Sequence, residues 1–452
     1  MKEECGVFGI FHQDVKMNVA QFCYLGLFAL QHRGQESAGI AISNEQKILI
    51  YRDLGLVSEI FTEEILNTLF GNLAIGHVRY STSGANRWEN SQPILEEHQS
   101  GSFALAHNGH IINQKELRKI LSLQGERIEE NQTDSHLISK LIKSTEGKNI
   151  ETAIEKVANY LKGAFCLVIL TKDKLIAVRD VHGFHPLALG KIEDGYVIAS
   201  EDSAFSIIGA EYIREIEPGE MIVISKNNCQ TKQILPCSKK SLCVFEYIYF
   251  ARPDSNIFGE NVAFIREKIG QRLAWEHPVE ADIVISVPDS GRFAALGYAQ
   301  ESGIPFQEGL LKNPYVGRTF IQPVQALREH LVRIKLSVIP RIIENRRVVM
   351  VDDSIVRGTT TRKLVKLLKR AGAKEVHVRI SSPPINFPCH FGIDTPNKED
   401  LWANHFSIEE IRKWIEADSL EYISLEGLLK VFQHHSPSNF CTACFNGLYP
   451  LS

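Results

Sequence analysis

The sequence predicts two domains of different class, a layered α+β domain followed by an α/β domain with a parallel sheet. Three observations lead to this prediction. The chain has 452 residues, which exceeds the size at which a single hydrophobic core stops growing. Strand-like runs dominate the first half, whereas they alternate with helical stretches in the second half. A polar, lysine-rich segment at residues 226–242 separates the two patterns, as a linker does.

The first domain is predicted to span residues 5–232. Stretches with helical periodicity separate its short strand-like runs, which is typical of a layered α+β fold. The predicted strands are Cys5–Phe11, Ile48–Tyr51, Ala104–His107, Phe165–Thr171, Leu175–Arg179 and Tyr196–Ser200.

The second domain is predicted to span residues 243–397, followed by a C-terminal helical segment at residues 398–452. Parallel strands need crossover connections, and helices are the usual ones, so regular alternation of strands and helices indicates a parallel sheet. The predicted strands are Ile283–Val287, Val348–Val351 and Val376–Ile380, and the helices are Gly259–Trp275, Phe293–Ser302 and Thr360–Ala371.

Composition and charge exclude several classes of protein. Hydrophobic residues make up 44% and charged residues 23%, which is typical of a folded chain. The net charge of -4 provides no strong field for binding nucleic acid or an anionic membrane. No apolar run approaches the roughly 18 to 20 residues that cross a bilayer. Nine cysteines without dense spacing fit reduced thiols, so we expect a cytoplasmic protein.

The first half contains a series of motifs that carry chemically active residues. Cys5 opens the first predicted strand, and the segments QHRGQESAGIA, HVRYSTSG and HNGHI follow, and then Asp134. At a mature N-terminus, a cysteine has an α-amine with a pKa of about 7.7 to 8.0 that can activate its own thiol. Taken singly, these features also fit a buried thiol, an ion pair of Arg79, a glycine turn and a helix N-cap at Asp134.

Together and in this order, the motifs resemble the class II glutamine amidotransferase domain of the N-terminal nucleophile hydrolases. The resemblance covers Cys5 to Ile224 and implies a layered αββα fold. It implies that the Cys5 thiolate attacks the carboxamide of glutamine, which releases ammonia and then glutamate. It further implies an oxyanion hole of Asn108 and the Gly109 backbone N–H, with Arg79 and Asp134 binding the α-carboxylate and the α-ammonium of glutamine.

Four residues, Met1 to Glu4, precede Cys5, so removal of the initiator methionine alone cannot expose the Cys5 amine. Some members of the resembling family carry such a leader ending in acidic residues. We therefore expect residues 1–4 to be a propeptide that processing removes.

The segment VVMVDDSIVRGTTTR, which starts at Val348, leads from a hydrophobic strand through two carboxylates and a hydroxyl-rich loop into a helix. Such carboxylates can bind a polyol or a divalent ion, while loop amides and a helix N-terminus can bind phosphate. The alternative is a strand-to-helix turn capped by Asp353 or Ser354. The segment resembles the ribose phosphate signature of type I phosphoribosyltransferases. The resemblance implies that phosphoribosyl pyrophosphate contacts Asp352, Asp353, Ser354, Arg357, Gly358, Thr359 and Thr360.

A second strand end, DIVISVPDSGRFAA, places Asp289 and Ser290 where open α/β sheets bind ligands. It resembles the pyrophosphate loop of the same family, which implies a magnesium site at Ser290, Asp352 and Asp353. The segment KNPYVGRTFIQP resembles the lid of this family, which implies substrate contacts from Lys312 and Arg318. The segment HLVRIKL resembles family positions near the pyrophosphate, which implies a contact from Lys335. Glu329 and His330 depart from that pattern, and a plain surface loop is the alternative.

Cys441 and Cys444 form a Cys-x-x-Cys pair, a spacing that suits a metal site or redox chemistry. Cys243 and Cys389 fall where an iron–sulfur subgroup of the resembling amidotransferases has its remaining ligands. The resemblance therefore implies a 4Fe-4S cluster on Cys243, Cys389, Cys441 and Cys444. Structural zinc and unliganded thiols are the alternatives.

The two resemblances together imply an enzyme that opens de novo purine synthesis. Ammonia from glutamine would displace pyrophosphate from phosphoribosyl pyrophosphate and give 5-phosphoribosylamine, over an enclosed path that preserves the free amine. The family also implies feedback inhibition by purine nucleotides and a homo-oligomer. Two alternatives remain: a class II amidotransferase with another acceptor, and a regulatory binder that senses phosphoribosyl pyrophosphate.

Overall fold

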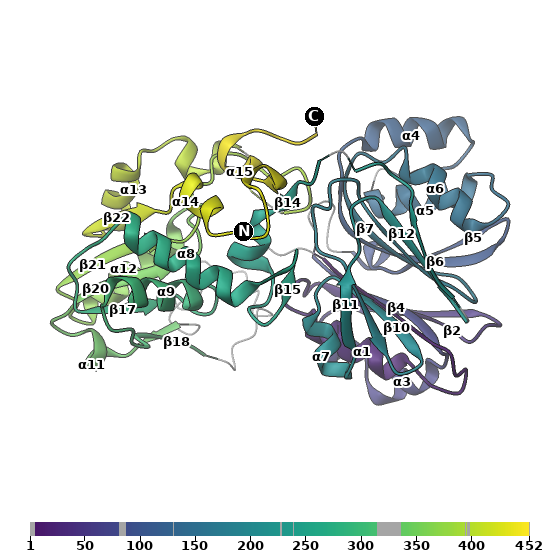
Figure 1. The fold of residues 1–452 in the computed structure, drawn as a ribbon, viewed down its shortest axis with the longest axis horizontal. Coiled ribbons are helices and arrows are strands. Elements are labelled where there is room, and N and C mark those ends of the chain that lie inside the picture. Colours follow the sequence, from purple (N-terminus) through teal and green to yellow (C-terminus); the bar gives the residue numbers. More distant parts are fainter. Residues whose placement is uncertain are drawn as a thin grey trace.

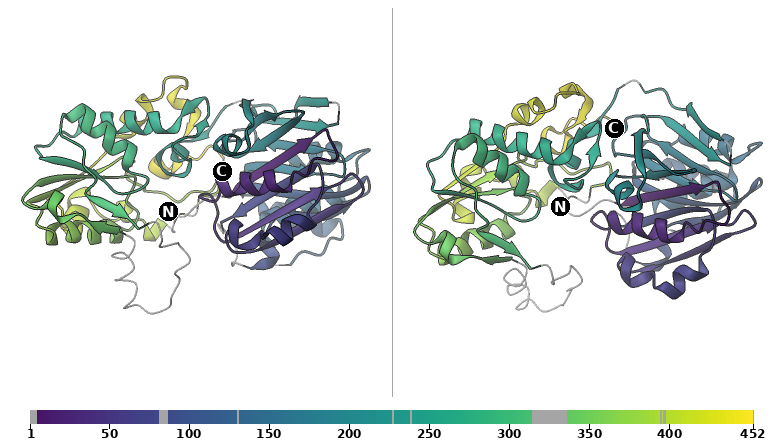
Figure 2. Two further views of the ribbon diagram at one scale, coloured as in Figure 1. Left: turned by 90° about the horizontal axis from the view of Figure 1, so that it is seen from below. Right: turned by 60° about the horizontal axis from the view of Figure 1, so that its bottom comes forward.

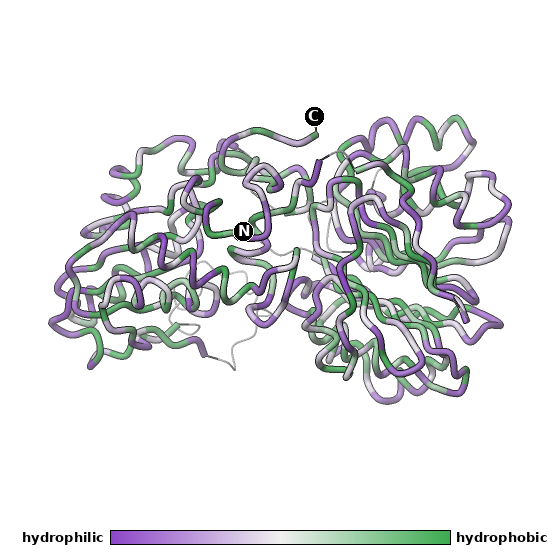
Figure 3. The backbone as a smooth tube through the Cα atoms, viewed as in Figure 1, coloured by the Kyte–Doolittle hydropathy of each residue, from purple (hydrophilic) through white to green (hydrophobic). Residues whose placement is uncertain are grey.

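The computed structural model describes residues 5–80, 87–129, 131–226, 228–237, 239–313, 336–393, 395 and 398–451. These residues form two lobes that meet along one boundary (Figures 1 and 2). Hydrophobic residues concentrate in the strands of both lobes (Figure 3). None of the helices in the described ranges is long and apolar enough to span a membrane.

The N-terminal lobe contains two stacked antiparallel sheets. The first has the strand order β11-β9-β10-β1-β4-β2-β3 and the second has the order β13-β12-β8-β7-β6-β5. Side chains from both sheets meet in one core that includes Val7, Ile75, Ala106 and Val168. The strands are β1 (Gly6–His12), β2 (Ser37–Ser43), β3 (Ile48–Leu54), β4 (Leu73–Arg79), β5 (Ile94–His98), β6 (Gly101–Ile111), β7 (Gly163–Leu170), β8 (Leu175–Arg179), β9 (Ala188–Ile192), β10 (Gly195–Ala199), β11 (Glu211–Glu215), β12 (Glu220–Ser225) and β13 (Asn228–Gln233).

Helices cover the outer face of each sheet. Helix α1 (Ala20–Ala29) packs on the first sheet, and α4 (Gln114–Leu123), α5 (Asp134–Ser144) and α6 (Ile150–Ala158) pack on the second. All seven residues of β1 are buried, because one face meets the other sheet and the opposite face meets α1. The lobe therefore has the predicted αββα layers. Shorter helices are α2 (Val57–Ile60), α3 (Glu63–Thr68), η1 (Trp88–Asn90) and α7 (Ser203–Ile208).

The C-terminal lobe contains a parallel sheet with the strand order β17-β20-β21-β22. Helices α8 and α9 cover one face, and α12 and α13 cover the other, which confirms the predicted α/β class. The elements are β17 (Ile283–Ser286), β20 (Arg347–Asp352), β21 (Glu375–Ile380), β22 (Ser419–Tyr422), α8 (Val262–Glu276), α9 (Arg292–Ser302), α12 (Thr359–Arg370) and α13 (Ile408–Ile415).

Smaller elements complete this lobe and its edges. They are β14 (Leu242–Cys243), η2 (Glu246–Phe250), β15 (Asn256–Ile257), β16 (Glu260–Asn261), β18 (Leu310–Lys312), β19 (Leu336–Val338), α11 (Pro340–Ile343), η3 (Lys398–Asp400), η4 (Trp402–Asn404), α14 (Leu425–Lys430), η5 (Pro437–Asn439), β23 (Phe440–Cys441) and α15 (Ala443–Asn446). Of these, η2 is a π-helical turn.

Two segments differ from the sequence prediction. Part of the expected linker at residues 226–242 is an edge strand, because β13 pairs with β12 over Asn228 to Gln233. Its side chains are polar and mostly exposed, which hides the strand pattern. The C-terminal segment is not only helical: β22 extends the parallel sheet, and β23 pairs with β14 beside the lobe boundary.

Candidate active sites

Cys5 lies immediately before β1 at the mouth of a small pocket in the N-terminal lobe. Its Sγ atom donates to the Tyr80 carbonyl oxygen at 3.4 Å, and the Tyr80 N–H lies 3.5 Å from the same sulfur. Burial raises the pKa of the Cys5 thiol to about 11, although the Tyr80 hydrogen bond and the Arg79 charge act in the opposite direction. The thiol is therefore protonated at neutral pH, and attack on a carbonyl carbon requires a base.

The structure brings four of the predicted glutamine-site residues to this pocket. Cys5, Arg79, Gly109 and Asp134 line it, together with Tyr80, Gln92, His107, Thr133 and Ser135. Asn108 precedes Gly109 on β6, and its buried amide nitrogen Nδ2 has no hydrogen-bond partner among the described residues. Gly109 has a φ of +136°, and a Cβ there would lie 2.2 Å from the Ala164 carbonyl oxygen. Only glycine fits this position, so its backbone N–H can approach a ligand closely.

The predicted partners of the glutamine α-substituents are buried and oppositely charged. Arg79 ends β4, and its Nη1 atom has no hydrogen-bond partner among the described residues. Asp134 is the first residue of α5, where its Oδ2 accepts the Ile111 N–H at 3.0 Å. The helix N-cap is Thr133, so the alternative role of Asp134 as the N-cap is wrong. An unpaired buried guanidinium nitrogen is costly, which favours an anionic ligand at Arg79.

Sequence reasoning missed a hydrogen-bonded network beside β6, the strand that carries Asn108 and Gly109. The Gln92 side chain accepts the His107 N–H at 2.7 Å and donates to the Ser135 hydroxyl at 3.0 Å. That hydroxyl lies 3.0 Å from His107 Nδ1, and His77 Nε2 donates to the His107 carbonyl at 3.1 Å. Burial lowers the pKa of His77 to about 3 and also lowers that of His107, so both rings are neutral. The network fixes the peptide next to Asn108, and no local spacing in the sequence signals it.

The second site lies at the carboxyl end of the parallel sheet. Asp352 ends β20, and Asp353 follows it; each is 7% exposed. The Ser290 hydroxyl hydrogen-bonds to Asp353 Oδ2, and the Ser354 hydroxyl donates to Asp353 Oδ1 at 2.5 Å. Burial, followed by the charge of Asp353, raises the pKa of Asp352 well above its usual range. Two adjacent buried carboxylates beside a hydroxyl suit a hard cation, which would favour their ionised forms.

The remaining residues that were predicted to contact phosphoribosyl pyrophosphate lie in several different places. Gly358 has a φ of +61° and is the N-cap of α12, where Thr359 and Thr360 supply the first backbone N–H groups. Asp289 forms an ion pair with Lys312, so these two residues lie together. Arg357 contacts Asp400 at 3.0 Å on the surface. Arg318 and Lys335 lie outside the described residues.

The four predicted cluster cysteines come from three segments. Cys243 of β14 is directly opposite Cys441 of β23 in the parallel register. Burial, and then the charges of Cys389 and Cys441, raises the pKa of Cys444, which places these thiols near one another. Among the described residues, no group of three or more His, Cys, Asp or Glu side chains is already arranged to hold a metal. The thiols fit a soft metal because thiolates are soft ligands and because they lie near one another.

The fold and the two sites define a class, namely a glutamine amidotransferase domain joined to a phosphoribosyltransferase domain. The glutamine amidotransferase domain family matches residues 77–206. The chain is 48% identical to the amidophosphoribosyltransferase of Bacillus subtilis over 100% of this chain and 94% of that protein. It is 48% identical to that of Archaeoglobus fulgidus over 99% of this chain and 98% of that protein. The chain belongs to the amidophosphoribosyltransferase family.

A solved structure supports the same assignment. The B. subtilis glutamine phosphoribosylpyrophosphate amidotransferase complexed with ADP and GMP superposes with a TM-score of 0.92 at 47% identity, covering 99% of this chain and 98% of that chain. A structure described as the allosteric regulatory enzyme of purine biosynthesis superposes with a TM-score of 0.93 at 48% identity, covering 99% of this chain and 96% of that chain.

Proposed function

We propose that the protein catalyses the glutamine-dependent first step of purine biosynthesis, in which phosphoribosyl pyrophosphate becomes 5-phosphoribosylamine. The observation that carries this proposal is that both half-sites occur in one chain of this family. One is the pocket of Cys5, Arg79 and Asp134, and the other is the buried pair Asp352 and Asp353. A glutaminase with another acceptor would not require the second site, and a sensor would not require the first.

In the first half-reaction, the Cys5 sulfur attacks the carboxamide carbon of glutamine. The thiol proton passes to a base, for which the α-amine of a processed Cys5 is suitable. The Asn108 amide and the Gly109 N–H stabilise the oxyanion, and Arg79 and Asp134 hold the amino acid end. Collapse of the intermediate breaks the C–N bond and releases ammonia, and water then cleaves the thioester to give glutamate.

In the second half-reaction, the ammonia nitrogen attacks the anomeric carbon, and the C–O bond to pyrophosphate breaks. We propose that Ser354 and the α12 residues Thr359 and Thr360 bind the 5-phosphate, since helix N-terminal N–H groups favour anions. Asp352 and Asp353 would bind the ribose hydroxyls. Arg357, Gly358, Asp289, Ser290, Lys312, Arg318 and Lys335 remain proposed phosphoribosyl pyrophosphate contacts.

Groups of both sites act on Tyr249, which lies in the short turn η2. Burial, followed by the charges of Asp353 and Asp352, raises the pKa of Tyr249, and Tyr80 beside Cys5 contributes in the same direction. Tyr249 is therefore near both sites. This arrangement supports transfer of ammonia between the sites over a short, shielded path.

Two inorganic groups are part of the proposal. Magnesium would be held by Ser290, Asp352 and Asp353, where a bound cation would offset charge on the departing pyrophosphate. A 4Fe-4S cluster would be held by Cys243, Cys389, Cys441 and Cys444, as a structural tie between the C-terminal segment and the lobe boundary. Visible absorbance of iron bound to thiolates would distinguish this cluster from structural zinc.

Regulation, assembly and location complete the proposal. We propose feedback inhibition by purine nucleotides, which the ADP and GMP in the related B. subtilis structure support. We also propose a homo-oligomer in the cytoplasm, and a propeptide at residues 1–4. An intact mass that includes the four leading residues on active protein would contradict the propeptide.

The decisive experiment measures glutamate and pyrophosphate release together, from anaerobically purified protein with glutamine and magnesium. Equal release of both products, with little glutamate when phosphoribosyl pyrophosphate is withheld, is the expected result. Glutamate without pyrophosphate would indicate another acceptor, and no release of either product would indicate a binding role.

A further inference from the structure

We propose that Glu246 is a positioning residue for the Cys5 nucleophile, although it belongs to the second lobe. Glu246 holds the buried Arg33 side chain, and Arg33 in turn holds the backbone carbonyl of Cys5. This inference rests on the proposed function, because it assigns Glu246 a role in the glutamine half-reaction.

Arg33 makes the contact with the nucleophile. It is 1% exposed, and its Nε atom donates to the Cys5 carbonyl oxygen at 3.1 Å. Cys5 precedes the first paired residue of β1, since the register with β4 starts at Gly6 and Val78. The sheet therefore does not fix the Cys5 carbonyl, and the Arg33 hydrogen bond provides that restraint.

Glu246 holds the other end of the Arg33 guanidinium in a two-pronged pair. Nη2 donates to Glu246 Oε1 at 2.7 Å, and Nη1 donates to Glu246 Oε2 at 3.0 Å. Both side chains are completely buried. A two-pronged contact between a guanidinium and a carboxylate fixes orientation as well as distance.

A second carboxylate contacts the same guanidinium and joins the same two lobes. Glu201 Oε1 accepts from Arg33 Nη1 at 2.6 Å and lies 2.7 Å from His32 Nε2. Its Oε2 accepts the Ser255 hydroxyl at 2.6 Å and the Arg252 N–H at 2.8 Å. Burial alone would raise the pKa of Glu201, but the His32 and Arg33 charges hold it well below its usual range. Glu201 therefore remains charged and keeps Arg33 paired when Glu246 is changed.

Glu246 is also contacted by His185 of the first lobe. His185 Nδ1 lies 3.3 Å from Glu246 Oε1, and His185 Nε2 donates to the Phe391 carbonyl at 2.7 Å. Glu246 is also the first residue of η2, the turn that places Tyr249 near the Asp352 and Asp353 charges. A displacement of η2 would therefore be transmitted to Arg33.

The backbone beside Arg33 also contacts the predicted glutamine-binding residue. A Cβ on Gly34 would lie 2.6 Å from the Val78 carbonyl carbon and 2.7 Å from the Arg79 nitrogen. The Glu36 N–H donates to the Arg79 carbonyl at 3.1 Å. The His32–Glu36 turn thus contacts both the nucleophile and Arg79, so its position affects the distance between thiol and substrate.

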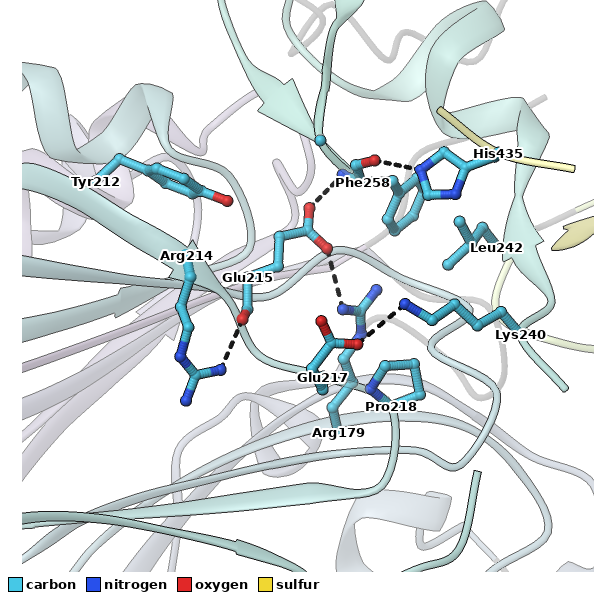
Figure 4. A pocket seen from close by; sticks show the side chains of 11 residues that line it. Arg179, Tyr212, Arg214, Glu215, Glu217, Pro218, Lys240, Leu242, Phe258 and His435 are labelled. Carbon is cyan, nitrogen blue, oxygen red and sulfur yellow. Dashed lines mark hydrogen bonds and ion pairs between the residues drawn. The ribbon is translucent and has the colours of Figure 1, made fainter. Parts of the chain in front are cut away.

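Another ion pair beside the lobe boundary supplies a control. A pocket there is lined by Arg179, Glu215, Glu217, Lys240 and Phe258, among others, and Arg179 pairs with Glu215 while Lys240 pairs with Glu217 (Figure 4). The Lys240–Glu217 pair at 3.0 Å is largely exposed, with side chains that are 39% and 59% accessible. Exposed pairs of this kind contribute little to stability. Lys240→Gln therefore removes a charge near the same boundary without touching Cys5 or Arg33.

The test compares Glu246→Gln with Lys240→Gln in the full-length, cluster-loaded enzyme. Glu246→Gln keeps the side-chain shape but removes the negative charge that contacts the Arg33 guanidinium. Three readouts are measured on each sample: glutamine-dependent synthesis, synthesis from ammonium salt in place of glutamine, and the alkylation rate of Cys5 by a diazoketone analogue of glutamine. The ammonium reaction does not use Cys5 and reports whether the second lobe is folded and active.

We expect Glu246→Gln to lower glutamine-dependent kcat/KM and Cys5 alkylation by about 100-fold, the scale of a misplacement of about 1 Å. Ammonium-dependent synthesis should be unchanged, and Lys240→Gln should match the wild type in all three readouts. Arg33→Lys keeps the positive charge but loses the two-pronged contact with Glu246. It should lower glutamine-dependent kcat/KM and Cys5 alkylation as Glu246→Gln does.

Two results would overturn the proposal. Wild-type glutamine kinetics in Glu246→Gln would show that Arg33 holds Cys5 without this partner. Equal losses in the glutamine and ammonium reactions would show a general structural role. Failure of the proposed function itself is distinct, because the wild-type enzyme would then release no pyrophosphate from phosphoribosyl pyrophosphate with ammonium.

Discussion

Asn108 is the residue whose substitution isolates transition-state stabilisation. Its buried Nδ2 has no partner among the described residues, so the donor is free to meet a developing oxyanion. We expect Asn108→Ala to lower kcat for glutamine hydrolysis by about 100- to 1000-fold, with a smaller change in KM. Steady-state glutamate release measures this, with Asn159→Ala at an exposed position as the control. A defect confined to KM would contradict the assignment.

Cys5 provides a pH test of the pocket. Because burial raises its pKa to about 11, the thiolate fraction is small at neutral pH and grows as the pH rises. We expect its alkylation by iodoacetamide to accelerate by about tenfold per pH unit between pH values of roughly 7 and 10. Peptide mass spectrometry on a Cys237→Ser background removes the signal of the exposed thiol. A rate that is half-maximal near pH 8.5 and levels off by about pH 10 would show that the thiol has an ordinary pKa.

A substitution of Asp353 tests the second half-reaction while leaving the glutamine site unchanged. Ser290 and Ser354 both hydrogen-bond to its carboxylate, so it is the centre of the second site. We expect Asp353→Asn to reduce pyrophosphate release by at least about 100-fold with either glutamine or ammonium as nitrogen source. Basal glutamine hydrolysis without phosphoribosyl pyrophosphate should persist, and Asp194→Asn at an exposed turn serves as the control. Retained synthesis from ammonium would exclude a central role for Asp353.

Residues with a local signature could be predicted from the sequence, whereas residues that act through distant contacts could not. The motifs HNGHI and VDDS can be recognised in the sequence because their strand, turn and polar residues are adjacent. Gln92, His107 and Ser135 meet only after folding, as do Arg33, Glu201 and Glu246, which are separated by up to 213 residues. No spacing rule connects such residues, since sheet packing alone brings them together.

At the scale of elements, the prediction succeeded where strands have a clear pattern. The cores of β1, β6, β7, β8 and β10 and of the parallel strands β17, β20 and β21 fall in predicted strands. Strand β2, with the sequence SAGIAIS, was missed because it is small-residue-rich and buried on both faces, which removes the alternation. Strand β13 was missed for the opposite reason, because its edge position permits polar residues throughout.

The contact between α8 and α9 leads to a prediction about stability. Gly270 of α8 and Gly297 of α9 face each other's backbone, and a Cβ on either would lie 1.9 Å from a carbonyl oxygen of the other helix. We therefore expect Gly270→Ala to force the helices apart and to destabilise the protein by about 1–3 kcal/mol, despite the higher helix propensity of alanine. Thermal unfolding measures the effect, with Lys268→Ala, two residues earlier on the same helix, as the control. Stabilisation by Gly270→Ala would show that the helices accommodate the methyl group.

At the scale of the whole molecule, the lobe boundary is formed by segments that are far apart in the chain. The Phe391 ring stacks on Phe184 at 4.3 Å, and the Phe391 carbonyl accepts from His185. Tyr449 and Leu451, near the end of the chain, pack with the same group of residues. The loop that contains Cys389 therefore contacts the N-terminal lobe directly, although its proposed cluster partners belong to other segments.

If the proposed cluster is bound by Cys389, this arrangement predicts that its loss loosens the contact between the lobes. The Phe391 N–H donates to Cys389 Sγ at 3.3 Å, so a cluster ligand at Cys389 would restrain the same loop that contacts Phe184 and His185. We expect Cys389→Ser to abolish the visible absorbance of bound iron and to increase amide hydrogen exchange at residues 163–167 and 184–185. Cys237→Ser, at an exposed thiol, should change neither. Lost absorbance with unchanged exchange at those residues would show that the boundary is held by protein contacts alone.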